Sequence, residues 1–158
     1  MGKKLNAIGI EPKSARKLAQ QLNDLLAAYQ VFYMNVRGFH WNIRGDKFFE
    51  LHLKFEELYN DLLMKIDEVA ERILTLGETP FHTYTDYLKK AGIPETPSVS
   101  DGREAVEHIL KMLSHVLELQ REILKTSAEV GDEGTNALMS DYIRAQEKLV
   151  WMYSAYLG

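Results

Sequence analysis

Residues 39–72 read FHWNIRGDKFFELHLKFEELYNDLLMKIDEVAER, and most of this run has the apolar spacing of one long helix. Apolar side chains recur at helical intervals up to a stop at Gly77, so the sequence predicts a helix over 48–76. Gly45 and Asp46 form the turn that precedes this helix, and Asp46 can cap its start. The residues before the turn also have helical spacing, so we expect a hairpin of two helices.

Four side chains in this run are good metal ligands: His40, His52, Asp67 and Glu71. Asp67 and Glu71 are four residues apart, so their carboxylates share one face of the predicted helix. His52 lies near the same stripe, but fifteen residues of helix separate it from Asp67 by about 22 Å, which is too far for one shared ion. The hairpin would bring His40 to His52 and leave both carboxylates at its far end.

Two copies of the chain can close this gap. If their long helices pack antiparallel about a two-fold axis near Asn60 and Asp61, His52 of one copy meets Asp67 of the other, and each dimer carries two identical sites. Two imidazoles with two carboxylates suit Fe(II), Mn(II) or Zn(II) better than calcium. The alternative is that these residues are ordinary solvated groups on an exposed helix face.

The residues in and around this run resemble a known family. FHWN at 39–42, His52 and DEVAER at 67–72 are similar to the Dps family (DNA-binding protein from starved cells), the mini-ferritin branch of the ferritin superfamily. The spacing H-x11-H-x14-D-x3-E matches that family's ferroxidase centre at every ligand. The closing WMYSAYL at 151–157 extends the resemblance over nearly the whole chain.

The resemblance implies both a reaction and an assembly. Family members form hollow twelve-subunit shells with a di-iron site at the dimer two-fold, where His40 and His52 would come from one subunit and Asp67 and Glu71 from its partner. Each site would oxidise two Fe(II), preferably with hydrogen peroxide, and the ferric mineral would be stored inside. Trp41 would lie beside the site, where its ring could take up an electron hole.

Other acidic positions match further roles in the family. Glu56 and Glu57 fall where relatives place inward-facing acids that nucleate mineral, although Leu53 replaces another acid found in some of them. Three acids surround the start of the last helix, which lines three-fold pores in the family: Asp132, Glu133 and Asp141. A pore role is one of two interpretations of these acids, because acids also favour helix N-termini for electrostatic reasons. Ala137 stands where the family often has a further acid.

The whole chain is predicted to be all-α, a ferritin-like four-helix bundle with a long crossover that contains a short helix between helices 2 and 3. The crossover, 77–100, is too long for a hairpin turn, so the helices on either side should be parallel. Asp101 and Glu104 have the spacing of a capping box. The predicted helices cover about 12 to 39–41, 48–76, 84–91, 101–128 and 133–156, after a tail at 1–11.

Length and composition are those of one soluble domain, 1–158. With 46% apolar and 27% charged residues the chain can build a core and is not predicted to be disordered. The absence of cysteine excludes disulfides and thiolate metal sites and fits a reducing cytosol. No segment resembles a signal peptide or a membrane span, so we expect a cytoplasmic protein without a membrane partner.

DNA binding is the alternative function that the resemblance raises. Phosphate contacts dominate such binding, and they need basic side chains. The net charge is −4, the predicted tail has only Lys3 and Lys4, and no basic extension follows the last helix. We therefore expect DNA binding to be weak or absent.

The remaining histidines do not predict a second metal centre. A ferritin with its site inside one bundle needs E-x-x-H on two helices, and the residue three before each of the five histidines is not glutamate. His82 is expected to be an ordinary loop residue. His108 and His115 are seven apart and share a face outside the apolar stripe. A second metal site there is one interpretation, but we expect these two residues to meet solvent or another subunit.

Overall fold

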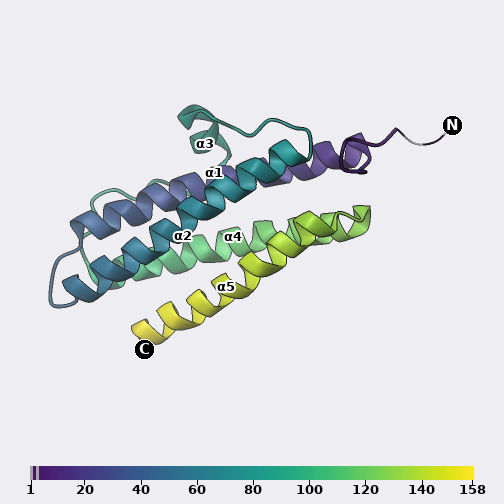
Figure 1. Ribbon diagram of the computed structural model, residues 1–158. Coiled ribbons are helices and arrows are strands. Elements are labelled where there is room, and N and C mark those ends of the chain that lie inside the picture. The colour runs from purple at the N-terminus through teal and green to yellow at the C-terminus, as the bar shows by residue number, and fades with distance from the viewer. Residues whose placement is uncertain (1, 3) are drawn as a thin grey trace.

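The computed structural model describes residue 2 and residues 4–158, and that part of the chain is all-α (Figure 1). It contains no strand within these residues, and none of its helices is long and apolar enough to cross a membrane. The helices are α1 (Pro12–Asn42), α2 (Phe48–Thr75), α3 (Tyr84–Lys90), α4 (Gly102–Val130) and α5 (Glu133–Leu157). The predicted four long helices and short crossover helix are therefore confirmed.

The long helices form two antiparallel hairpins, α1 with α2 and α4 with α5 (Figure 1). Side-chain hydrogen bonds show the direction of α4 against α1. Asn35 bonds Met112, whereas Gln21, about 21 Å earlier along α1, bonds Thr126. These pairs show that α4 is antiparallel to α1 and so parallel to α2. The crossover between α2 and α4 runs along the bundle, as the sequence predicted.

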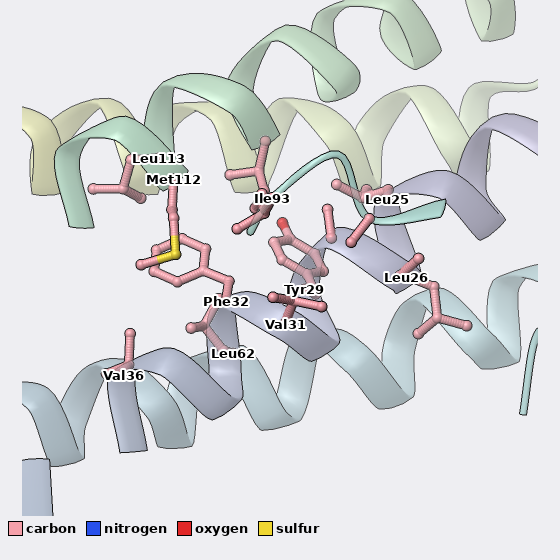
Figure 2. Close-up of a cluster of buried hydrophobic side chains, with 14 of the residues drawn as sticks. Leu25, Leu26, Tyr29, Val31, Phe32, Val36, Leu62, Ile93, Met112 and Leu113 are labelled. Atoms are coloured by element: carbon pink, nitrogen blue, oxygen red, sulfur yellow. The ribbon is translucent and has the colours of Figure 1, made fainter. Parts of the chain in front are cut away.

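The core centres on α1. Figure 2 shows side chains of α1 such as Tyr29 and Phe32 filling the space between α1, α2 and α4, together with Leu62, Met112 and Leu113. Burial of an apolar stripe along α1 drives the packing of the bundle, because hydrophobic burial is the dominant favourable contribution to the free energy of folding. Six apolar side chains that recur at helical spacing along α1 are fully buried: Leu18, Leu22, Leu25, Tyr29, Phe32 and Val36.

Three neutral polar side chains form a closed ring of hydrogen bonds in the middle of this core. The Tyr29 hydroxyl donates to Gln120, Gln120 donates to Gln146 at 2.7 Å, and Gln146 donates back to the Tyr29 oxygen at 2.9 Å. Burial raises the pKa of Tyr29 well above its usual value, so the phenol keeps the proton that it donates. The ring links α1, α4 and α5 without placing a charge inside the bundle.

Two asparagines of α1 hold the crossover in place. Asn23 donates to a backbone carbonyl and accepts from a backbone amide of residues 79–81, at 3.1 and 2.7 Å. Asn35 makes the same pair of bonds with residues 94–96, both at 3.0 Å. Both asparagines are buried, so each end of the crossover is fixed to α1 by a two-point contact.

Two local predictions about helix starts have different outcomes. Asp101 caps α4 by accepting from the Glu104 amide at 2.9 Å, as predicted. The predicted cap of α2 by Asp46 is wrong, because the N-cap residue is Lys47 and no side chain bonds the first turn. The tight turn after Gly45, with φ of 110°, carries the chain into α2 without a side-chain cap.

The predicted tail is attached to the bundle for part of its length. Asn6 accepts from the Ile10 amide at 2.8 Å and donates from its side chain to the Leu76 carbonyl at 3.1 Å. Residues 6–10 therefore form a turn that covers the C-terminal end of α2, which the sequence pattern did not indicate. Lys3, which entered the expectation about DNA, lies outside the described residues.

Replacing Asn35 with alanine should lower the free energy of unfolding by about 1–3 kcal/mol, because a carbonyl and an amide of residues 94–96 would lose their partners. Thermal unfolding at a fixed protein concentration measures the change. Gln20→Ala, on the exposed surface of the same helix, is the matched control and should have little effect. Equal shifts in the two variants would contradict the clamping role.

Candidate metal centre

The α1–α2 hairpin brings His40 and His52 into contact. Their rings are stacked, with centroids 3.8 Å apart and planes inclined by 11°. His40 is buried near the end of α1, and His52 is half-buried in the second turn of α2. The predicted approach of these two residues across the turn is confirmed.

Each of the two imidazoles is fixed by the backbone of the other. His40 Nδ1 lies 2.5 Å from the His52 carbonyl oxygen, and His52 Nδ1 lies 2.7 Å from the His40 carbonyl oxygen. A carbonyl oxygen can only accept, so both Nδ1 atoms carry the proton that is donated. In the neutral imidazole the lone pair is then on Nε2, and bonding of the other ring nitrogen to a carbonyl is typical of metal-ligating histidine.

The two carboxylates do not join the histidines within one copy of the chain. Asp67 and Glu71 are exposed and lie far along α2, which is one unbroken helix from Phe48 to Thr75. Among the described residues no group of three or more histidines, aspartates or glutamates is close enough to hold a metal ion. A single copy therefore presents half of the predicted ligand set at each end of α2.

Aromatic side chains surround the histidine pair. Phe48 stacks on His52 at 4.9 Å, and Tyr59 meets the His40 ring edge-on at 5.2 Å. Trp41 is 57% exposed next to His40, and the guanidinium of Arg37 lies over its ring at 4.6 Å.

The sequence reasoning did not single out Tyr59 or Arg37. Arg37 could have been found from its spacing, because Tyr33, Arg37 and Trp41 recur every four residues and so share one side of α1. Tyr59 carries no comparable signal, since it comes from α2 and meets this side only through the hairpin.

The two acids predicted to contact mineral, Glu56 and Glu57, have different surroundings. Glu57 borders a groove of about 630 Å³ between α2 and α5 that also contains Leu53 and Lys54, whereas Glu56 does not line it. Lys54 pairs with Glu57 at 3.0 Å, and both side chains are about half exposed. Such an exposed pair is weak and leaves the carboxylate available to a cation.

Asp132 differs from the other acids at the start of α5, because it is buried and already bonded. It accepts from Arg72 at 2.7 Å and from the Thr135 hydroxyl at 2.5 Å. It also caps α5 through the Thr135 amide. These bonds support the interpretation of Asp132 as an acid that stabilises the start of a helix, whereas Glu133 and Asp141 are exposed.

The other histidines contact their own chain and do not form a second cluster. His108 stacks on Phe39 at 6.1 Å, and His115 Nε2 lies 3.0 Å from the Ala91 carbonyl oxygen. Both are half-buried and keep some exposure to solvent, and the contact of His115 fixes the end of α3. His82 is exposed in the crossover, as predicted.

Comparisons with known proteins place this geometry in a family context. A model of the ferritin-like domain matches residues 19–158. The chain is 43% identical to a DNA protection during starvation protein of Porphyromonas gingivalis, over 99% of this chain and 98% of that protein. It is 54% identical to an uncharacterized protein of Haemophilus influenzae, over 94% and 93% of the two chains.

Solved structures show the same similarity. A crystal structure of a Dps protein from Vibrio cholerae O1, described as a member of a broad superfamily of ferritin-like diiron-carboxylate proteins, superposes with a TM-score of 0.97 and 56% identity. The match covers 100% of this chain and 99% of that one. A Dps protein from Bacillus brevis superposes with a TM-score of 0.89 at 32% identity, over 92% and 98% of the chains.

Replacing Asp132 with alanine should lower the free energy of unfolding by about 2–4 kcal/mol, because the half-buried Arg72 would lose its charged partner and α5 would lose its N-cap. Asp141→Ala is the control, since Asp141 pairs with Arg144 in an exposed position and should contribute less than about 1 kcal/mol. Chemical denaturation of both variants gives the comparison. Equal losses of unfolding free energy in the two variants would show that the contact with Arg72 stabilises the fold no more than an exposed ion pair does.

Proposed function

This chain belongs to the Dps family of ferritin-like proteins, and from that premise we propose that it oxidises Fe(II) at sites shared between two subunits and stores the ferric product inside a hollow homo-oligomer. The histidine pair carries this proposal. Both rings are held with Nδ1 protonated, so the tautomer that they adopt is the one that can bind a metal through Nε2.

The donor set fits iron as the substrate. Two imidazoles from one subunit and the carboxylates of Asp67 and Glu71 from its partner give mixed nitrogen and oxygen ligands, which suit Fe(II). The partner is needed because α2 is one unbroken helix, which keeps Asp67 about 22 Å and Glu71 about 28 Å from His52 of the same chain. Antiparallel packing of two α2 helices about a two-fold axis supplies both halves, twice in each dimer.

Two irons at one site match the electron demand of hydrogen peroxide. Two Fe(II), one H2O2 and two protons give two Fe(III) and two water molecules, so no hydroxyl radical is left over. His40 and His52 would hold the metal, and Asp67 and Glu71 would offset its growing positive charge. Iron storage and removal of peroxide would then be one activity.

Storage needs a place where ferric iron first collects. We assign this role to Glu56 and Glu57, since both lie close to the histidine end of α2 and Glu57 borders the groove with Glu50 and Asp61. Carboxylates suit hard ferric ions, and a twelve-subunit shell would repeat these positions on its inner surface.

DNA binding is a second candidate because the relative from Porphyromonas gingivalis is named for DNA protection. The chain has 23 acidic against 19 basic side chains, so its overall field repels phosphate. We therefore propose that any protective effect of this protein comes from iron and peroxide chemistry and not from coating DNA.

A mixing experiment tests the shared site. His52→Ala and Asp67→Ala should each abolish rapid Fe(II) oxidation, but joint refolding of the two should restore part of it. Random pairing makes half of the dimers hybrids, and each hybrid has one intact site, so about a quarter of all sites should work. Oxidation is followed by absorbance, with shell size measured in parallel.

The matched control mixes His52→Ala with His40→Ala. Both changes fall in the same half of the site, so no combination of these two subunits contains an intact set of ligands. Recovery in this control, or none in the first mixture, would show that the four residues are not divided between subunits as proposed.

A gel-shift assay tests the DNA question. The assembled protein should leave linear duplex DNA unretarded at both low and moderate salt, because few phosphates would be neutralised. Retention that weakens steeply with added salt would contradict this expectation.

A further inference from the structure

Arg72 ties the carboxylate end of α2 to the first turn of α5. Its Nε donates to the Thr135 hydroxyl at 2.9 Å, and its Nη2 donates to Asp132 at 2.7 Å. The two acceptors also bond each other, because the hydroxyl and the amide of Thr135 both donate to Asp132, at 2.5 and 3.1 Å. The guanidinium therefore binds, with two nitrogens at once, to a pair of acceptors that is already fixed.

Gly134 makes room for the guanidinium against α5. A Cβ at this residue would lie 2.7 Å from Nη2 and 2.8 Å from Nη1 of Arg72, which is too short for a non-bonded contact. Gly134 is the second residue of α5, where the helical backbone does not itself require glycine. The missing side chain therefore serves the contact with Arg72.

The direction of Arg72 is linked to the direction of the proposed ligands. Successive residues of an α-helix are turned by about 100°, so Glu71 lies about 100° and Asp67 about 140° around α2 from Arg72. With Arg72 held against α5, both carboxylates point away from α5, and both are exposed. This is the side on which the histidines of a second subunit are proposed to bind.

The separation of α2 from α5 changes along their length. A groove of about 630 Å³ divides the two helices over the half of α2 that contains Glu50 and Asp61. At the other end, Arg72 bridges them directly. Glu71 lies one turn before the last residue of α2, and the end of a helix lacks part of the backbone hydrogen bonding of its interior. A side-chain anchor is most useful there, because metal ligands must be held to within about 0.5 Å.

We propose that Arg72 is a positioning residue of the metal site. By holding the end of α2 against Asp132 and Thr135, it directs Asp67 and Glu71 towards a metal that is bound by the histidines of a partner subunit. Asp132 also neutralises the guanidinium, so this neighbouring charge does not pair with the carboxylates that the metal needs. The inference rests on the proposed function and gives a role in metal binding to a residue that does not touch the metal.

Binding of Co(II) to the assembled protein tests this role without the oxidation reaction. Co(II) accepts imidazole and carboxylate ligands, and its visible absorption bands depend on its coordination. The sites to follow are those that His52→Ala removes. Arg72→Gln should keep the shell size but lower the affinity of these sites for Co(II) by about tenfold, a loss typical of residues that orient metal ligands. The bands should change as well, because the carboxylates would be less well placed.

Gly134→Ala separates positioning from stability. The added methyl group would displace the guanidinium, which is the mobile end of a long side chain, whereas Asp132, Thr135 and the charge of Arg72 all remain. Alanine also favours the helical state more than glycine does, which offsets part of any lost stability. This variant should therefore bind Co(II) more weakly, as Arg72→Gln does, at a nearly unchanged unfolding temperature.

The matched control is Arg121→Gln. Arg121 also joins two helices, through an exposed pair with Glu147 at 3.0 Å, and its loss should leave Co(II) binding unchanged. Unchanged affinity in Arg72→Gln or, should that variant not assemble, in Gly134→Ala would overturn the inference. An equal loss of affinity in Arg121→Gln would overturn it too.

Asp67→Ala distinguishes this inference from the proposed function. If Asp67→Ala loses the Co(II) sites while Arg72→Gln and Gly134→Ala keep them, the positioning role fails and the proposed shared site stands. If Asp67→Ala and His52→Ala both bind Co(II) as tightly as the unsubstituted protein, the proposed site fails and the positioning role fails with it.

Discussion

The rigidity of α2 is the constraint on which the rest of the structure depends. An unbroken helix from Phe48 to Thr75 fixes the distance between its ends at 1.5 Å per residue, and no side chain can shorten it. The hairpin with α1 adds a second histidine at one end, while Asp67 and Glu71 remain at the other. A complete set of ligands around one ion then requires a second molecule, so assembly and chemistry become inseparable in the proposed function.

The bundle interior is consistent with this arrangement. Where a metal site within one bundle would need carboxylates and histidines on facing helices, this chain has a neutral ring of one phenol and two amides, Tyr29, Gln120 and Gln146. Each polar atom in that ring has a partner, so the ring adds specificity to the packing without the desolvation cost of buried charge. The four proposed ligands lie outside this ring, towards the two ends of α2.

Periodicity was enough to predict the helices, the crossover and the approach of His40 to His52, because each follows from local spacing and the geometry of one turn. The missed features depend on contacts between residues far apart in the chain. Asp132 is buried because Arg72 reaches it from another hairpin, and Asn6 bonds Leu76 across seventy residues. The wrong cap at Asp46 has a local cause, since the turn places Lys47 at the helix start. The sharing of the site, with Asp67 and Glu71 supplied by the partner of the subunit that holds His40 and His52, stays a prediction.

The crossed bonds between the two histidines have a consequence for the speed and the selectivity of capture. Because each ring is anchored to the carbonyl of the other, both are aligned as soon as the hairpin folds, and an arriving ion has no side-chain rotation to wait for. The same aligned rings are available to any divalent ion that binds imidazole. The selectivity for one metal over another would then depend on the carboxylates of the neighbouring molecule. It would be set by the subunit interface and not by the fold of one chain.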